Sequence, residues 1–280
     1  MGRYCNAVRN LLEFAYPIPE GRVTIMETRF QLPFGDSYIP CILSQPDSGQ
    51  VQRIVLGVHG FGGSSQDAIQ VSIAEEMSLF RSATVRFDFP AHGESPLGSE
   101  GFTLENCALT LLTVADYARQ QYEEVEDLCI FATGFGAYVT LLCLQELLEL
   151  PCRIRLVVQT PSLLMHETLL AMTGLSRETL RALDRYTVPN ERPFDVTYSL
   201  YETLRNNIVL TTYPIPFLIL HGEEDAYISM ADIQNFHRIN ERSELAIIPG
   251  ASHRFLEEGA WDMVLDLTRD WFEFEQVLLL

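Results

Sequence analysis

Short apolar runs alternate with longer helical patterns along most of the chain. The runs are five to seven residues long, which is the length of a buried strand rather than of a helix. They lie at positions 53–58, 83–88, 127–133, 154–160, 216–220 and 244–248. The helical patterns cover positions 66–80, 104–122, 138–150 and 262–277. Alternation at this spacing predicts a parallel sheet with helices on both faces.

Two further strand-like segments precede this alternation, at 23–32 and 38–44. The four residues between them, 33–36, read Pro-Phe-Gly-Asp, and these residue types favour a turn. The pattern predicts an N-terminal antiparallel hairpin. Together with the six apolar runs, it brings the expected α/β sheet to about eight strands.

The alternation is interrupted between residues 161 and 213, where helix-like and proline-containing sequence takes its place. We interpret this stretch as a cap inserted over the carboxyl edge of the sheet. The chain has 280 residues, which is enough for one large α/β domain and short for two independent ones. We therefore expect a single domain over 1–280 with a cap insertion at 161–213.

The composition is that of a folded protein, with 47% hydrophobic and 20% charged residues. The chain has 19 basic and 38 acidic side chains, which give a formal charge of −19. Such a charge repels phosphate backbones and anionic membrane surfaces. We expect neither a nucleic-acid nor a membrane partner, and we interpret the charge as a solvated surface.

The cysteines and the N-terminal sequence bear on the cellular compartment. Six cysteines are scattered without a C-x-x-C pair, which is typical of reduced thiols in a protein core. The N-terminus has no apolar stretch followed by a small-residue cleavage site, and no stretch approaches 18 uninterrupted apolar residues. We expect a cytoplasmic protein, with no metal and no cofactor.

Polar and glycine-rich residues gather in four loops that follow predicted strands. At the carboxyl edge of a parallel sheet such loops converge on one crevice. The loops are 59–63, 88–95 and those that carry Asp225 and His253. Glycines in the first loop permit a tight turn whose amides, such as that of Phe61, can face an oxyanion; a plain strand-to-helix turn is the alternative. The second loop is rich in turn-forming residues and is expected to fix loop shape.

Four motifs along these loops carry a resemblance to a known family. They are His59-Gly60-Phe61, Arg86-Phe87-Asp88-Phe89-Pro90-Ala91-His92-Gly93-Glu94-Ser95, His221-Gly222-Glu223-Glu224-Asp225 and Gly250-Ala251-Ser252-His253. In this order and spacing the chain resembles the α/β-hydrolase superfamily, nearest the feruloyl (cinnamoyl) esterases, from about residue 23 to 274. The resemblance implies the α/β-hydrolase fold and a triad in the order nucleophile, acid, histidine.

The nucleophile position of that family holds a glycine in this chain. The turn after the fifth strand reads Ala132-Thr133-Gly134-Phe135-Gly136-Ala137, where the family has G-x-S-x-G. Gly134 replaces the serine and Ala132 the first glycine, and the two changes together favour natural divergence over an engineered substitution. Glycine adopts the strained turn readily but has no oxygen that could form an acyl-enzyme. We expect little or no ordinary serine-esterase activity.

The remaining site positions of the family are present. Asp225 matches the catalytic acid that orients the imidazole, and His253 matches the general base. The backbone amides of Phe61 and Phe135 match the oxyanion hole. The expected substrate-binding positions are Gly60 and Gly62.

No other side chain is expected to replace the missing serine. Thr133 should point to the opposite side of the turn, and Cys129 should be buried and inert. The remaining hydroxyls near the crevice lack a strained turn beneath them. They belong to Ser64, Ser65, Ser95 and Ser162.

Two functions are open at this point. In the first, His253 supported by Asp225 acts as a general base on water or on an acidic substrate proton. In the second, the protein binds a small ester or an aromatic or acyl ligand under the cap without turnover. Apolar cap residues either line such a pocket or pack the cap onto the main domain: Leu163, Leu164, Met165, Leu169, Met172, Phe194, Tyr198 and Tyr201. A homodimer through the cap is also open.

Overall fold

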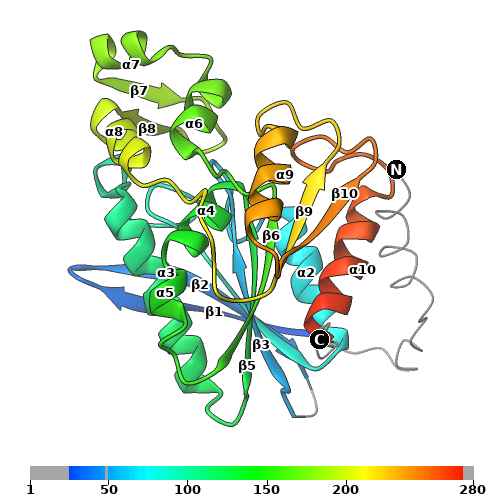
Figure 1. Ribbon diagram of the computed structural model, residues 1–280. Coiled ribbons are helices and arrows are strands. Elements are labelled where there is room, and N and C mark those ends of the chain that lie inside the picture. Colours follow the sequence, from blue (N-terminus) through cyan, green and yellow to red (C-terminus); the bar gives the residue numbers. More distant parts are fainter. Residues whose placement is uncertain (1–24, 48–49, 274–280) are drawn as a thin grey trace, which may run out of the picture.

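A computed structural model describes residues 25–47 and 50–273, and its main feature is one eight-stranded sheet (Figure 1). The strand order is β1-β2-β4-β3-β5-β6-β9-β10. Only β1 and β2 run antiparallel to their neighbours, and the other six strands are parallel. The bounds are β1 Ile25–Phe34, β2 Ser37–Pro46, β3 Arg53–Val58, β4 Ser82–Phe87, β5 Asp127–Thr133, β6 Arg153–Gln159, β9 Phe217–Gly222 and β10 Glu244–Ile248. The predicted mostly parallel sheet with an N-terminal hairpin is confirmed.

The β1–β2 hairpin has a tighter turn than the sequence suggested. The prediction placed all of 33–36 in the turn, but Pro33 pairs with Tyr38 and Phe34 with Ser37, which leaves a two-residue turn. Gly35 has a φ of +56°, a conformation that favours glycine. Pro33 is tolerated inside a strand because β1 is at the edge of the sheet, where a missing N–H need not break a ladder.

Helices cover both faces of the sheet, as predicted (Figure 1). On one face lie α3 (Leu104–Gln121), α4 (Gly134–Leu142), α5 (Leu144–Leu147) and α9 (Met230–Ile239), and on the other lie α2 (Ala68–Leu79) and α10 (Ala260–Glu273). Each face of the sheet has its own hydrophobic core: the first core lies under α3, α4, α5 and α9, and the second lies under α2 and α10. Successive residues of β3 alternate between them, so that Leu56 packs into the first core and Val55 into the second. Because both faces are covered, the central strands are continuously apolar and buried.

Two helices differ from the sequence prediction. The helix expected over 138–150 begins at Gly134, directly after β5, and is divided at Cys143 into α4 and α5. Helix α9 was not predicted, because the sequence between β9 and β10 is rich in charged and polar residues. It forms because Ile233 and Phe236 bury one apolar side against the core. The part of the predicted C-terminal helix beyond Glu273 lies outside the described residues.

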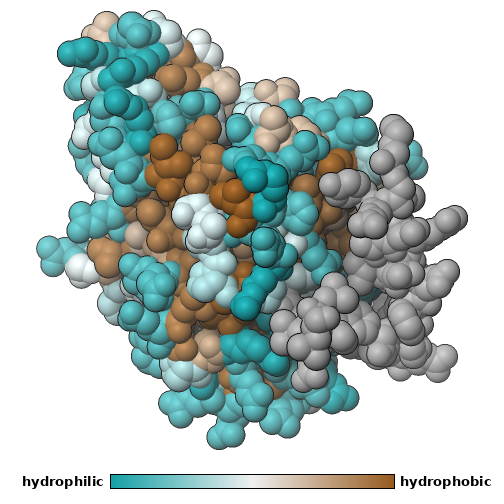
Figure 2. Space-filling model, in the orientation of Figure 1, coloured by the Kyte–Doolittle hydropathy of each residue, from teal (hydrophilic) through white to brown (hydrophobic). Residues whose placement is uncertain are grey.

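The 161–213 segment contains three helices and a small two-stranded sheet. Its elements are α6 (Met165–Thr173), α7 (Arg177–Leu183), β7 (Arg185–Val188), β8 (Phe194–Thr197) and α8 (Tyr198–Asn206). Figure 1 shows them together beyond one end of the main sheet. In Figure 2 the far end of the segment, around α7, is mostly hydrophilic, and apolar residues gather where the segment meets the rest of the chain. The short β7–β8 pairing was not predicted, because Pro189 and Pro193 interrupt any strand pattern there.

Several predicted absences can be compared with the structure. In the part of the chain that the structure describes, no helix is long and apolar enough to cross a bilayer. Within residues 25–47 and 50–273, no group of three His, Cys, Asp or Glu side chains is placed to hold a metal ion. The five cysteines in these ranges are free, and four of them are buried. Cys5 lies outside the described residues.

Candidate active site

The turn at Gly134 joins β5 to α4. Gly134 has a φ of +49°, and a Cβ built on it would have only the Gly60 Cα within 4 Å, at 3.9 Å. Two residues later the backbone is crowded, since a Cβ on Gly136 would lie 2.4 Å from the His59 carbonyl oxygen. The turn therefore requires glycine at 136 for close packing, whereas at 134 it has the strained backbone of a nucleophile turn and room for a side chain.

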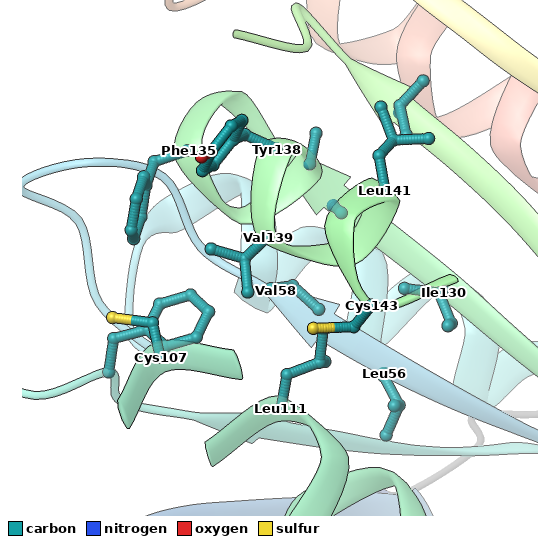
Figure 3. Close-up of a cluster of buried hydrophobic side chains, with 14 of the residues drawn as sticks. Leu56, Val58, Cys107, Leu111, Ile130, Phe135, Tyr138, Val139, Leu141 and Cys143 are labelled. Carbon is teal, nitrogen blue, oxygen red and sulfur yellow. The ribbon is translucent and has the colours of Figure 1, made fainter. Parts of the chain in front are cut away.

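Helix α4 is held in the first core by apolar contacts (Figure 3). Figure 3 shows Val139 of α4 beside Val58 of β3, with Leu111 of α3 beneath. Phe135 lies in the first turn of α4 and is almost fully buried, at 2% exposure. Since its side chain is fixed in the core, the backbone amide of Phe135 has a defined position at the start of the helix.

The glycine loop after β3 is held by the ring of His59. Nδ1 of His59 donates to the carbonyl oxygen of Gly60 at 2.8 Å, and Nε2 accepts from the amide of Phe89 at 3.1 Å. The accepting role of Nε2 identifies the neutral tautomer with the proton on Nδ1. His59 is fully buried, so the loop that carries Phe61 is tied to the core. The sequence motif contained His59 but gave no sign of this role.

The 88–95 loop has the structural role expected of it. The buried Asp88 carboxylate accepts the amides of Ser65 at 2.7 Å and Glu94 at 2.8 Å. A Cβ on Gly93 would lie within 2.4 Å of that carboxylate, and Gly93 also has a positive φ. All of these contacts shape loops.

Asp225 and His253 lie on the loops that follow the neighbouring strands β9 and β10. Nδ1 of His253 donates a hydrogen bond to Oδ2 of Asp225 at 2.8 Å. Oδ1 of Asp225 accepts the backbone amides of Tyr227 at 2.8 Å and Ile228 at 3.0 Å. The Asp225 side chain is 0% exposed and that of His253 is 13% exposed. The structure therefore joins the two side chains that the sequence selected.

The protonation states of this pair follow from its contacts. Burial by itself raises the pKa of Asp225, but the hydrogen bond and charge of His253 and the two backbone amides lower the pKa more, and it lies below its ordinary value. Asp225 is therefore an anion at neutral pH and only accepts hydrogen bonds. Because Nδ1 of His253 donates to it, Nε2 of the neutral imidazole is left as a proton acceptor.

A second histidine, His221, lies beside this pair. Its Nδ1 is 4.0 Å from Oδ2 of Asp225, and its side chain is almost fully buried. Burial lowers the pKa of His221 below its ordinary value. The next residue, Gly222, is required by packing, because a Cβ there would lie 2.4 Å from the Ala251 carbonyl oxygen. The sequence analysis missed His221 as a neighbour of the site, although its place in the motif around Asp225 was a usable signal.

The side chain of Phe61 lies in a cluster of aromatic rings. Its ring is 5.1 Å from that of Phe194, 6.2 Å from those of Phe102 and His92, and 6.4 Å from that of Phe135. Burial lowers the pKa of His92 to about 3, so this imidazole is neutral and acts as a packing group. Phe194 comes from the 161–213 segment, so this cluster joins that segment to the glycine loop.

Most of the residues of the 161–213 segment that were candidates to line a pocket are buried in the core. Five of the eight named from the sequence are buried in the first core: Leu163, Met165, Leu169, Phe194 and Tyr201. The structure thus favours packing over pocket lining for these side chains.

Comparison with solved structures identifies the architecture. Est1E from Butyrivibrio proteoclasticus, solved with ferulic acid bound, superposes with a TM-score of 0.75 at 20% identity, over 87% of this chain and 97% of that one. Alpha/beta hydrolase domain-containing protein 10 from mouse gives 0.70 at 15% identity, over 88% and 98%. The esterase domain of a Rhodothermus marinus protein gives 0.63 at 18% identity, over 89% and 97%. This chain has the α/β-hydrolase fold.

The comparisons in sequence add no further assignment. No protein-family model matches the chain, and no curated protein matches it significantly. At 15–20% identity the structural likeness establishes the fold, and the chemistry has to be argued from the residues present.

Within the α/β-hydrolase fold, the hydroxyl and thiol groups near the Gly134 turn are either hydrogen-bonded to the backbone or buried. Oγ1 of Thr133 contacts the Val58 carbonyl oxygen at 3.5 Å and lies on the Gly60 side. Ser95 and Ser162 are buried. Cys129 is completely buried, and burial raises the pKa of its thiol far above the ordinary value. Ser95, Ser162 and Cys129 are thus closed to solvent, and the expectation that none of these side chains acts as a nucleophile stays a prediction.

A hollow of about 400 Å³ opens elsewhere on the α/β-hydrolase fold, at the side of the β1–β2 hairpin. Arg29, Tyr38, Asp88 and Glu94 are among the residues that line it. Asp225, His253 and Gly134 do not line this hollow. It is therefore separate from the candidate site.

Proposed function

We propose that this protein is an esterase-like member of the α/β-hydrolase superfamily whose triad lacks its nucleophile, and that it has little or no ordinary serine-esterase activity. In this proposal His253, oriented by Asp225, acts as a general base on water or on an acidic substrate proton. The observation that carries it is the 2.8 Å hydrogen bond from His253 to a fully buried Asp225 carboxylate.

The persistence of this pair has a physical meaning. A buried carboxylate is costly unless its hydrogen-bonding capacity is used, and Asp225 accepts three hydrogen bonds. Because Nδ1 of His253 donates to Asp225, the tautomer of a neutral imidazole has Nε2 as its proton acceptor. A pair kept in this state favours a working general base over an unused remnant of a triad.

For a small ester, the proposed reaction proceeds in one displacement. Nε2 of His253 removes a proton from water, and the resulting hydroxide forms a C–O bond to the ester carbonyl carbon. The amides of Phe61 and Phe135 are assigned to stabilise the oxyanion. The intermediate then collapses, the bond to the alkoxide breaks, and His253 returns the proton to that leaving group. The products are an acid and an alcohol, and no acyl-enzyme forms.

The choice of first substrates follows from the structural neighbours. Est1E was solved with ferulic acid bound, so feruloyl and cinnamoyl esters come first in a panel with p-nitrophenyl esters, lactones and thioesters. We place the substrate between the glycine loop and His253, with the 161–213 segment as a cap over it and Gly60 and Gly62 beside it.

The first experiment is His253→Ala. The native protein is expected to convert at least one substrate of the panel, and His253→Ala is expected to abolish that turnover, with a loss on the order of 10²–10⁴-fold. Leu256→Ala, an exposed change on the same loop, serves as the matched control. If no member of the panel is converted by the native protein, the general-base proposal fails.

The second experiment restores the missing hydroxyl with Gly134→Ser. The Cβ at this position has no neighbour closer than 3.9 Å, so the serine fits, and p-nitrophenyl or feruloyl ester hydrolysis with an acyl-enzyme burst is expected. Gly134→Ala is the control, because it adds the Cβ without the oxygen. Continued inactivity of Gly134→Ser would show that the oxyanion hole or the substrate site has been lost as well.

The alternative, a binding protein without turnover, has less support. It shares with the first proposal a ligand site under the 161–213 segment, but it gives the hydrogen-bonded Asp225–His253 pair no role. Binding of ferulate to the native protein and to His253→Ala with equal affinity, without turnover of any ester, would favour this alternative.

A further inference from the structure

The loop between β7 and β8, residues 189–193, contacts two loops that are distant from it in the sequence. Nδ2 of Asn190 donates to the Gly62 carbonyl oxygen at 2.7 Å, across 128 positions of sequence. A guanidinium nitrogen of Arg192 donates to the carbonyl oxygens of Gly93 at 2.7 Å and His92 at 3.2 Å. Both side chains therefore bind backbone carbonyls of the loops that follow β3 and β4.

The glycine loop depends on such contacts because it has few side chains of its own. The loop has a single backbone–backbone hydrogen bond of its own, from the Gly63 amide to the Gly60 carbonyl at 3.1 Å, and Gly62 has a φ of +73°. Glycine gains the most conformational freedom when a contact is lost, so an unrestrained loop of this composition samples many shapes.

Two side chains hold backbone carbonyls close to the Phe61 amide, one in its own peptide unit and one two peptide units further along the loop. His59, fixed in the core, holds the carbonyl of Gly60, and Asn190, from the 161–213 segment, holds the carbonyl of Gly62. The ring of Phe61 packs edge-on against that of Phe194. Phe194 is the first residue of β8, four positions after Asn190. The Phe61 amide therefore lies between a carbonyl that is held by the core and a carbonyl that is held by the 161–213 segment.

The contact at Asn190 is close and depends on donor chemistry. A Cβ on Gly62 would lie 3.3 Å from Nδ2 of Asn190, so the amide sits directly over the glycine. Asn190 is exposed, and burial does not hold it in place. An aspartate of the same size would turn a donor into an anion that faces a carbonyl oxygen, which is repulsive.

We infer that Asn190 is a positioning residue of the site: by holding the Gly62 carbonyl, it fixes the Phe61 amide in the direction that stabilises an oxyanion. This inference rests on the proposed function, in which the Phe61 amide receives the developing negative charge. It assigns the β7–β8 loop a role in stabilising the transition state, in addition to the role of the 161–213 segment as a cap. Release of Asn190 would remove one of the contacts that hold the glycine loop.

The first test measures the loop directly, without any substrate. Hydrogen exchange with mass spectrometry over residues 57–66 compares the native protein with Asn190→Asp, Asn190→Ala and the neighbouring exposed change Glu191→Gln. Exchange at 60–63 is expected to be at least about tenfold faster in Asn190→Asp, less so in Asn190→Ala, and unchanged in Glu191→Gln. Equal thermal midpoints would show that the effect is local. Unchanged exchange in Asn190→Asp overturns the inference.

The second test measures catalysis in the Gly134→Ser background with a p-nitrophenyl ester. Adding Asn190→Asp is expected to lower kcat about tenfold or more with KM changed less than about twofold, since the oxyanion is present only in the transition state. Faster exchange with an unchanged kcat assigns Asn190 a purely structural role and overturns the inference. If Gly134→Ser is itself inactive, the oxyanion hole or the substrate site has been lost and the role of Asn190 in oxyanion stabilisation is overturned, whereas turnover of the substrate panel by the native protein decides the proposed function separately.

Discussion

The Asp225–His253 pair and the Gly134 turn differ in the reactive groups that they carry. The pair has both side chains and all of its hydrogen bonds, with the carboxylate completely buried. The turn has its strained backbone and its close contact at Gly136, but no reactive atom. The Asp225–His253 pair thus has both reactive groups and a defined geometry, whereas the Gly134 turn has a defined geometry without a reactive group.

This difference bears on how the site works. The buried Asp225 carboxylate would be costly without partners, because its desolvation is offset only by the donors around it. The turn, by contrast, persists for reasons of folding, since it joins a central strand to a core helix. A retained turn is therefore weak evidence for function, and the retained pair is stronger evidence.

The largest expected effect is a difference in stability between substitutions at two glycines of the turn, Gly136 and Gly134. Gly136→Ala should destabilise the fold by about 3 kcal/mol or prevent folding, because its Cβ meets two backbone carbonyls. Gly134→Ala should cost only about 1–2 kcal/mol, which is the cost of a positive φ without a clash. Urea unfolding of both variants measures the difference. Equal losses would contradict the claim that only position 136 is closed to a side chain.

The next effect concerns the pair and its dependence on pH. Asp225→Asn should lower the free energy of unfolding at pH 7 by about 2 kcal/mol, since a buried charged acceptor is replaced. Because the folded pKa of Asp225 lies below the unfolded value near 3.8, its contribution is fully present above that value and is lost as pH falls through the folded pKa. The gap between native protein and variant should therefore close on acidification below about pH 4. Urea unfolding from pH 7 to pH 3 measures it, and a constant gap would refute the assignment.

The smallest effect tests what holds His253. The ring of Tyr227 lies edge-on to His253 with centroids 5.3 Å apart, but Tyr227 is 44% exposed. Tyr227→Ala should cost about 0.5 kcal/mol, well below the effect of Asp225→Asn. Thermal unfolding at neutral pH compares the two variants. A loss as large as that of Asp225→Asn would mean that packing, and not the carboxylate, orients the imidazole.

The local features of the site were accessible from the sequence. Asp225 and His253 were selected because each follows a strand in a recognisable motif, and neighbouring parallel strands bring such loops together. Gly134 was placed on the turn because the strand before it and the last glycine of the motif fix its position. Helix α9 was missed although half of its ten residues are hydrophobic; its stability comes from packing against the core.

Contacts between distant segments were not accessible in this way. The sequence left open whether Phe194 and Leu169 line a pocket or pack into the core, and the fold buries them. Nothing in the local pattern around Asn190 indicates that it binds the carbonyl of Gly62, 128 positions away. The acceptor is a backbone atom, so no side-chain type marks it.

The sequence by itself determined the alternation of strands and helices, the glycine on the turn after β5, and the aspartate and histidine on the loops after β9 and β10. These follow from periodicity and residue identity, which act over a few positions. Only the tertiary structure decided that the acid and histidine are hydrogen-bonded, that the turn has room at 134 but not at 136, and that the β7–β8 loop holds the glycine loop. Those are distances between atoms of remote segments, and they are set by how the layers pack.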